Sequence, residues 1–290
     1  MFKGTLTAIV TPFRDGEVDE RALRDHIEWQ VQSGVDGIVP CGSTGESATL
    51  SHAEHERVIR ITVEQVRKRV PVVAGTGSNS TAEAIRLTAS AREMGADGAL
   101  LISPYYNKPT QDGIFKHYKT IATSVDLPLL VYNIPGRTGS NIAPETFARL
   151  AEVKNIVGVK EASGSMDQTS DILRLCGDRL TILSGDDALT VPLMALGAKG
   201  VIATIGNVMP REMHELAAAG LAGDFARARE IHYRMLPLMR ALFIETNPIP
   251  VKQALAFMGR CCNELRMPLV PMTAPAAEKL RAAMKELRLV

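Results

Sequence analysis

Residues 156–164 have the sequence Ile-Val-Gly-Val-Lys-Glu-Ala-Ser-Gly, a short apolar run that ends on Lys160 and breaks into small residues. Such a run is typical of a parallel β-strand covered on both faces. Burial disfavours the charged amine and lowers a lysine pKa by up to about 3–5 units. A neutral lysine attacks carbonyl carbons to form a Schiff base. Lys160 is therefore a candidate nucleophile, although a strand-end lysine can also extend to solvent or pair with Glu161.

The rest of the chain repeats this pattern of a short apolar strand followed by an amphipathic helix. The eight expected strands cover residues 6–11, 37–39, 72–75, 98–102, 129–132, 156–160, 181–184 and 200–203. The helices that follow them are expected at residues 19–32, 51–70, 81–94, 111–125, 144–153, 165–175, 188–196 and 211–219. Ser51 with Glu54, and Ser80 with Glu83, have the spacing of a capping box at two helix starts. Eight alternating strand–helix units predict a (β/α)8 TIM barrel, an α/β fold with a closed parallel sheet.

The strand pattern stops near residue 222. Beyond it, residues 225–243, 250–259 and 274–288 predict three more helices. No low-complexity linker precedes them. We therefore expect a barrel over residues 1–222 that carries the active site, and a C-terminal three-helix extension over residues 223–290 packed on the barrel.

Composition narrows the class of protein. The 290 residues are 46% hydrophobic and carry a net charge of +1, with no basic stripe, so neither nucleic acid nor a membrane surface is expected as a partner. The four cysteines lack the spacing of a zinc site or a disulfide framework. No apolar run approaches the roughly 18 residues of a membrane span, and no signal peptide is recognisable. These features predict a cytoplasmic protein with reduced cysteines.

Reactive and polar side chains follow several of the expected strands. A TIM barrel carries its chemistry at the carboxyl ends of its strands, and the residues there include Ser43, Thr44, Tyr105, Tyr106, Tyr132, Arg137, Lys160 and Gly185. A phenol beside a hydroxyl can shuttle the protons that an imine-forming lysine needs. Arg137 can bind a carboxylate through two hydrogen bonds. Taken alone, the glycine-rich segment fits a turn, the two adjacent tyrosines fit surface packing, and Arg137 fits a solvated charge; their placement on one rim favours a site.

These motifs resemble the dihydrodipicolinate synthase family of class I pyruvate-dependent lyases. The resemblance extends over almost the whole chain and rests on residues 8–12, 42–46, 104–107, 132–139, 159–162, 185–187 and 247–252. The Gly-Arg-Thr-Gly segment at 136–139 is the more specific motif, because relatives that act on sugar acids generally lack its arginine. Ser43 departs from the threonine that is common in the closest synthases but keeps a hydroxyl, so it gives no help on the substrate.

The resemblance implies an activity in diaminopimelate and L-lysine biosynthesis. Lys160 would form a Schiff base with pyruvate, and the derived enamine would add to L-aspartate 4-semialdehyde. Tyr132, hydrogen-bonded to Thr44, would relay protons together with Tyr106 of a neighbouring subunit. Arg137 would hold the carboxylate of the aldehyde substrate. The pocket would be lined by Ser43, Thr44, Gly185 and the backbone of Ile202. No metal or organic cofactor is expected, because the lysine is the electron sink.

The resemblance also suggests inhibition by L-lysine at a dimer interface in a homotetramer built from two tight dimers. The matching positions are Ser47, Ala48, His52, His55, Asn79, Glu83 and Tyr105. Glu83 could pair with an amino group, and the spacing of His52 and His55 puts them on one helix face. A plainer interpretation makes both histidines surface residues. Two histidines are too few for a zinc site, which takes three or four ligands.

Two other functions remain open from the sequence. A lyase on the same barrel that cleaves N-acetylneuraminate or a 2-keto-3-deoxy sugar acid would keep Lys160 and Tyr132 but would not need Arg137. A catalytically silent barrel that senses an α-keto acid would form the imine without turnover. A metal-dependent aldolase is disfavoured, since no histidine–carboxylate cluster lies at the strand ends.

Overall fold

The computed structural model describes residues 2–290, and its central element is a closed barrel of eight parallel strands. The strands are β1 (Gly4–Ala8), β4 (Gly37–Val39), β5 (Val73–Gly75), β6 (Gly98–Ile102), β7 (Leu129–Asn133), β8 (Ile156–Glu161), β9 (Thr181–Ser184) and β10 (Gly200–Ala203). Their order is β4-β1-β10-β9-β8-β7-β6-β5. A parallel bridge between Ile38 and Val72 joins the two ends of this sheet. The predicted (β/α)8 barrel is confirmed.

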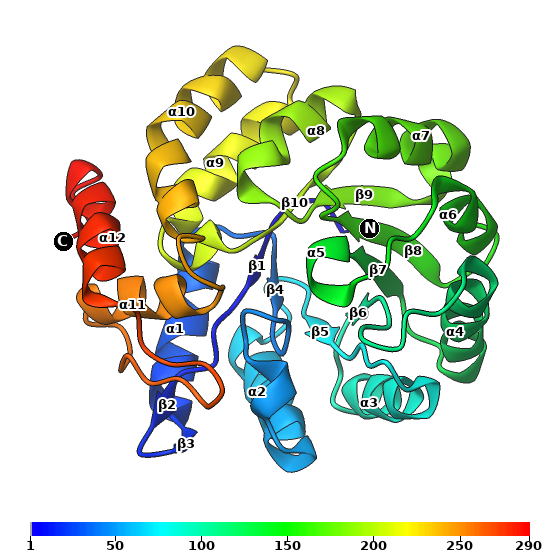
Figure 1. Ribbon diagram of the computed structural model, residues 1–290, viewed down its shortest axis with the longest axis horizontal. Helices are drawn as coiled ribbons and strands as arrows, with labels where there is room; N and C mark the ends of the chain where they lie inside the picture. The colour runs from blue at the N-terminus through cyan, green and yellow to red at the C-terminus, as the bar shows by residue number, and fades with distance from the viewer. Residues whose placement is uncertain (1) are drawn as a thin grey trace.

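Helices surround the strands (Figure 1). Those of the barrel are α1 (Glu20–Gln32), α2 (His52–Val66), α3 (Thr81–Glu93), α4 (Gln111–Ser124), α5 (Pro135–Thr138), α6 (Pro144–Leu150), α7 (Met166–Cys176), α8 (Thr190–Leu196) and α9 (Pro210–Leu221). The chain then forms α10 (Phe225–Ala241), α11 (Ile249–Phe257) and α12 (Ala274–Glu286). None of the helices described is long and apolar enough to cross a membrane.

The interior of the barrel is filled by large apolar side chains that alternate with outward-facing ones along each strand. One buried cluster consists of Phe2, Leu6, Ala8, Val39, Val73, Leu100, Leu130, Tyr132, Leu183 and Ile202. A second buried cluster contains Val201 of β10, Met213 of α9, Met235 of α10, Val251 of α11 and Leu280 of α12. The C-terminal helices thus share a continuous apolar core with the barrel wall.

The chain near its start differs from the expectation. The first strand was predicted at residues 6–11, but β1 ends at Ala8, and a short antiparallel hairpin follows it, formed by β2 (Phe13–Arg14) and β3 (Glu17–Val18). The turn of this hairpin uses Asp15 and Gly16 with φ of 55° and 82°, in the left-handed region that a tight turn requires. Two-residue strands are too short to produce a visible alternation in the sequence.

Two details at helix ends also differ. The helix expected to reach residue 70 ends at Val66, because Arg67 and Lys68 adopt left-handed backbone conformations (φ 51° and 59°). Ser51 and Glu54 form the complete capping box. Ser80 accepts only the backbone N–H of Glu83, because the Glu83 carboxylate binds elsewhere.

Candidate active site

Lys160 lies inside the barrel, next to Tyr132. The two residues are paired in register on β8 and β7, and Lys160 is paired with Leu183 on β9. The Lys160 Nζ lies 4.3 Å from the centroid of the Tyr132 ring. Only 6% of Lys160 is exposed. The strand therefore carries the amine into the apolar interior, close to its carboxyl end.

The neighbouring Glu161 faces the other side of the sheet. Its carboxylate accepts hydrogen bonds from Asn133 Nδ2 at 3.0 Å and from the Ser163 N–H at 2.7 Å. Successive side chains of a strand alternate between faces, so this carboxylate is directed away from Lys160. The alternative in which Glu161 neutralises Lys160 is therefore wrong.

Burial changes the protonation of the groups around the amine. Desolvation lowers the pKa of Lys160 to about 8, with the negative charge of Asp187 opposing the change and Arg137 adding to it. Desolvation also raises the pKa of Asp187 to about 6, although its carboxylate accepts hydrogen bonds from the N–H groups of Ile205 (2.7 Å) and Thr204. The pKa of the Tyr132 phenol is raised for the same reason. A lysine with this pKa has an appreciable neutral fraction near neutrality.

Gly185 follows β9 and makes room for the lysine side chain. A Cβ at this position would lie 3.1 Å from Lys160 Cε and 2.7 Å from the Ala162 Cβ. Contacts this close are avoided in packed proteins, so a larger residue would displace the lysine. The absence of a side chain at residue 185 is thus a steric requirement of the site.

Thr44 and Arg137 are linked through a residue of the C-terminal region. Thr44 is buried, and its Oγ1 accepts a hydrogen bond from Asn247 Nδ2 at 3.0 Å. The backbone carbonyl of Asn247 accepts a hydrogen bond from an Arg137 guanidinium nitrogen at 2.8 Å. Within the described residues 2–290, the expected hydrogen bond between Thr44 and the Tyr132 hydroxyl is not formed. Asn247 instead of Tyr132 donates to the Thr44 hydroxyl.

A cavity of about 470 Å³ opens at the carboxyl ends of these strands. It is lined by Ser43, Tyr132, Arg137 and Asn247 from the substrate side, and by Ser47, Ala48, His52, His55, Glu83 and Tyr105 from the expected effector site. Part of the predicted substrate site and most of the predicted effector site therefore line the same cavity, although Asn79 does not. Lys160, Thr44, Gly185 and Ile202 are not among its lining residues. Ile202 is buried in the same apolar cluster as Tyr132.

The residues expected to bind an effector are brought together. His52 Nε2 lies 3.0 Å from Glu83 Oε1, and the Ser78 hydroxyl donates to Glu83 Oε2 at 2.5 Å. Asn79 Nδ2 donates to the Tyr105 carbonyl at 3.2 Å. His55 is buried, and its Nε2 lies 2.8 Å from the Gly75 carbonyl oxygen. Glu83 is thus a partly exposed carboxylate that faces the cavity.

Tyr106 stands apart from these residues in its own chain. It has a left-handed backbone conformation (φ 70°) and its side chain is 89% exposed. Tyr105, beside it, is 37% exposed. Two adjacent exposed phenols on a loop are suited to contact with another subunit.

Two residues of the site were not identified as such from the sequence. Asp187 and Asn247 both lie in motifs that carried the resemblance, but an acidic residue after a strand and an Asn-Pro pair are common at loops and turns. Within residues 2–290, no cluster of three or more histidine, cysteine, aspartate or glutamate side chains is arranged to hold a metal ion.

Comparison with known proteins places this architecture in one family. A profile described as the dihydrodipicolinate synthetase family matches residues 1–287. The 4-hydroxy-tetrahydrodipicolinate synthase of Syntrophus aciditrophicus is 60% identical over 290 residues, which cover 100% of both chains. The chloride-inhibited dihydrodipicolinate synthase of Acinetobacter baumannii complexed with pyruvate is 44% identical, with a TM-score of 0.99 and 100% of both chains covered. The lysine-bound DHDPS of Cyanidioschyzon merolae is 41% identical, with a TM-score of 0.97, covering 100% of this chain and 99% of that one.

Proposed function

This chain belongs to the dihydrodipicolinate synthetase family, and we propose that it catalyses the 4-hydroxy-tetrahydrodipicolinate synthase reaction of diaminopimelate and L-lysine biosynthesis. Its substrates are pyruvate and L-aspartate 4-semialdehyde. The observation that carries this proposal is the buried amine of Lys160, whose pKa is lowered to about 8, beside the phenol of Tyr132 at 4.3 Å from its ring centroid.

The reaction begins with attack of the neutral Lys160 amine on the ketone carbon of pyruvate. Loss of water gives the imine, and removal of a methyl proton converts the imine to an enamine. The enamine carbon adds to the aldehyde of L-aspartate 4-semialdehyde. The amino group of that substrate then attacks the imine carbon, releases Lys160 and closes the six-membered ring. The imine formed on Lys160 is the electron sink when the methyl proton is removed.

The surrounding residues supply proton transfer and orientation. Tyr132 and Thr44 carry protons to and from the reacting atoms, with Tyr106 of a neighbouring subunit completing the relay. Arg137, on the short helix α5 at the cavity, holds the carboxylate of the aldehyde substrate. Ser43, Thr44, Gly185 and the Ile202 backbone shape the pyruvate pocket.

The activity is tested by supplying pyruvate and L-aspartate 4-semialdehyde and following NADPH oxidation by the next reductase of the pathway. Steady turnover that depends on both substrates is the expected result. Lack of condensation, together with cleavage of N-acetylneuraminate or of a 2-keto-3-deoxy sugar acid, would move the assignment to a sugar-acid lyase. Imine formation without any turnover would make the protein an α-keto-acid binder.

The same proposal includes a homotetramer made of two tight dimers and feedback inhibition by L-lysine. The exposure of Tyr106 supports a subunit contact next to the site, and the lysine bound in the relative from Cyanidioschyzon merolae supports the effector. Sedimentation velocity tests the tetramer. A protomer-sized species that retains full turnover would remove the role of Tyr106 in a neighbouring active site.

We also propose that the protein acts in the cytoplasm, which fractionation of the cells that make it would test. Residues 1–222 form the catalytic barrel and residues 223–290 an extension that depends on it. A chain truncated after residue 222 is expected to be unstable, because it exposes the cluster that Met213 shares with Met235 and Leu280.

A further inference from the structure

A second lysine is buried at the rim of the barrel, and the reaction does not use it. Lys252 of α11 is 0% exposed. Its Nζ donates to Glu46 Oε1 at 2.5 Å and to the Glu264 carbonyl at 2.7 Å, and lies 4.1 Å from the centroid of the Phe13 ring. Desolvation lowers the pKa of Lys252, while Glu46 opposes the change. A buried ion pair contributes little net stability by itself, because desolvation of the two charges offsets their attraction. Stability alone therefore does not explain why Lys252 and Glu46 are buried here.

Glu46 ends the loop that carries Ser43 and Thr44. Its other carboxylate oxygen, Oε2, accepts the backbone N–H of Arg266 at 3.1 Å. Both oxygens are therefore held by residues of the C-terminal region, 206 and 220 positions away along the chain. A charge with both oxygens bonded in a dry environment has little freedom to move.

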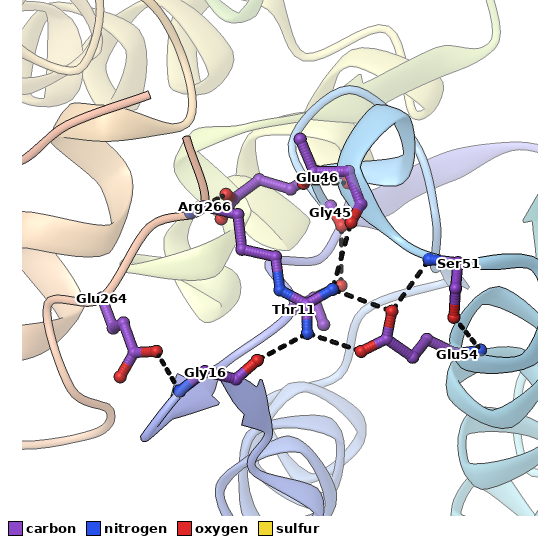
Figure 2. A network of polar contacts seen from close by, with 9 residues as sticks. Thr11, Gly16, Gly45, Glu46, Ser51, Glu54, Glu264 and Arg266 are labelled. Atoms are coloured by element: carbon purple, nitrogen blue, oxygen red, sulfur yellow. Dashed lines mark hydrogen bonds and ion pairs between the residues drawn. The ribbon is translucent and has the colours of Figure 1, made fainter. Parts of the chain in front are cut away.

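Arg266 extends this connection to the neighbouring elements (Figure 2). Its guanidinium donates to Glu54 Oε2 at 2.8 Å, to the Thr49 carbonyl at 3.1 Å and to the Gly16 carbonyl at 2.7 Å. Glu54 is the acidic member of the capping box that starts α2. In the same view, the Thr11 hydroxyl donates to the Gly45 carbonyl at 2.7 Å, so the loop is held from both sides.

The loop between these contacts has a conformation that its sequence does not favour. Cys41 and Glu46, which flank the segment, both have left-handed backbone conformations, with φ of 56° and 53°. Such conformations are uncommon for residues other than glycine and persist where the surrounding structure imposes them. The backbone of Cys41 packs closely against Gly75 of β5, since a Cβ on Gly75 would lie 2.1 Å from the Cys41 carbonyl oxygen. The segment that presents Ser43 and Thr44 has backbone hydrogen bonds of its own, from the Gly45 N–H to the Gly42 carbonyl at 3.0 Å and from the Glu46 N–H to the Ser43 carbonyl at 3.2 Å. The contacts of Glu46 with the C-terminal region add to these.

We propose that the buried Lys252–Glu46 ion pair is a positioning device of the active site, through which the C-terminal region holds Ser43 and Thr44 in their reactive placement. Lys252 and Glu46 are positioning residues, since neither is assigned a step in the reaction. The inference rests on the proposed function for its catalytic readout. Its structural part, that the pair fixes residues 42–46, stands independently of the reaction.

The test compares Lys252→Met, Glu46→Gln and the double variant, together with Glu46→Asp, which keeps the charge and shortens the side chain. In each variant kcat is expected to fall on the order of tenfold or more, because small misplacements of catalytic groups are costly. Lys252→Met and Glu46→Gln are expected to act as a unit, so that the double variant loses no more kcat than the single ones. The double variant leaves no unpaired charge and keeps the test valid where Lys252→Met fails to fold.

Arg69→Met is the matched control. Arg69 pairs with Glu28 through two hydrogen bonds of 2.8 and 2.7 Å, beyond the carboxyl-terminal end of α2 and away from the site. This variant is expected to keep the wild-type kcat. Hydrogen exchange supplies the readout that does not need turnover: exchange of the amides of residues 42–46 is expected to rise in Lys252→Met and Glu46→Asp but not in Arg69→Met.

The outcomes separate the two proposals. Folded variants with wild-type kcat and unchanged loop exchange would overturn the positioning role, even if their Tm falls. Faster loop exchange with unchanged kcat would also overturn it. The wild type could fail to condense the two substrates while amide exchange of residues 42–46 still rises in Lys252→Met and Glu46→Asp. That result would refute the proposed function and support the structural part of the inference.

Discussion

Tyr132 and Lys160 are paired in register on adjacent parallel strands, with the lysine Nζ 4.3 Å from the centroid of the phenol ring. Parallel pairing places equivalent positions of neighbouring strands side by side, so both side chains enter the barrel at the same level. The apolar interior that surrounds them lowers the pKa of the lysine to about 8 and raises that of the phenol. This single register therefore brings the nucleophile next to a proton donor that stays protonated.

The lowered pKa predicts how imine formation depends on pH. Only the neutral amine attacks pyruvate, so the rate should rise with pH and level off above a pKa near 8. The measurement is the rate of imine formation with pyruvate, trapped by borohydride, between about pH 6 and about pH 10. A rate that keeps rising toward the ordinary lysine pKa of 10.5 would contradict the account.

The same burial predicts that the catalytic lysine destabilises the protein. Lowering a pKa from 10.5 to about 8 corresponds to about 3 kcal/mol of unfavourable free energy for the buried charge. This cost is fully present below about pH 8 and is relieved as the pH rises from there to 10.5, because the folded protein then binds fewer protons than the unfolded chain. Lys160→Met should therefore raise the free energy of unfolding at neutral pH by up to about 3 kcal/mol while abolishing turnover.

Urea unfolding of the wild type and Lys160→Met at about pH 7 and about pH 10 checks this prediction. The difference between the two proteins should shrink at the higher pH. A variant less stable than the wild type at both pH values would show that the lysine contributes packing that outweighs its charge.

Removing the phenol hydroxyl should slow the reaction without preventing imine formation. Tyr132→Phe is expected to lower kcat by about 10²–10⁴, the usual contribution of a positioned proton-transfer group. Tyr118→Phe is the matched control, because Tyr118 is fully buried and its hydroxyl donates to the Leu101 carbonyl at 3.1 Å. That control should cost about 1 kcal/mol of stability and leave kcat unchanged. Equal kcat in the two variants would remove Tyr132 from the relay.

Substitution of Arg137 should weaken the binding of L-aspartate 4-semialdehyde and leave the reaction with pyruvate unchanged. Arg137→Lys keeps the charge but loses the two-pronged geometry, so KM for L-aspartate 4-semialdehyde should rise about 10- to 100-fold, equivalent to a charged hydrogen bond of about 1.5–3 kcal/mol. Trapping of pyruvate on the enzyme should not change. A parallel loss of pyruvate trapping would place the arginine at the pyruvate end of the cavity instead.

L-Lysine should bind through the carboxylate of Glu83, which already lies 3.0 Å from His52. Isothermal titration of the wild type should give heat. Glu83→Gln should weaken binding at least about 10-fold, since a charged hydrogen bond is worth about 1.5–3 kcal/mol. Glu93→Gln, an exposed change at the other end of α3, serves as the control. The absence of heat with the wild type would remove the effector site.

Much of the barrel could be predicted because its signals are local. Each strand is a short apolar run, each long helix has a regular apolar face, and Ser51 with Glu54 marks a start that the structure confirms. The exceptions are elements below the length at which periodicity can be seen, namely the hairpin of β2 and β3 and the four-residue helix α5. The end of α2 depends on the left-handed Arg67, a residue type that gives no such signal.

The site was predictable only in part, because some of its contacts join distant segments. Lys160 and Tyr132 could be placed on one rim, since the two strands expected at 129–132 and 156–160 end on them, and the structure pairs them in register. The contact of Asn247 with Thr44 spans 203 positions, and that of Lys252 with Glu46 spans 206. No local pattern specifies such contacts. They depend on how the C-terminal helices pack on the barrel, which is decided by the whole apolar core.

The role of Lys160 as the nucleophile is tested by borohydride reduction in the presence of pyruvate, followed by peptide mass spectrometry. A reduced pyruvate adduct is expected on Lys160 and none on Lys252, although both lysines are buried, because Lys252 is held by Glu46. The adduct should be lost in Lys160→Ala. No adduct on Lys160, or an adduct on another lysine that persists in Lys160→Ala, would contradict the assignment of Lys160 as the nucleophile.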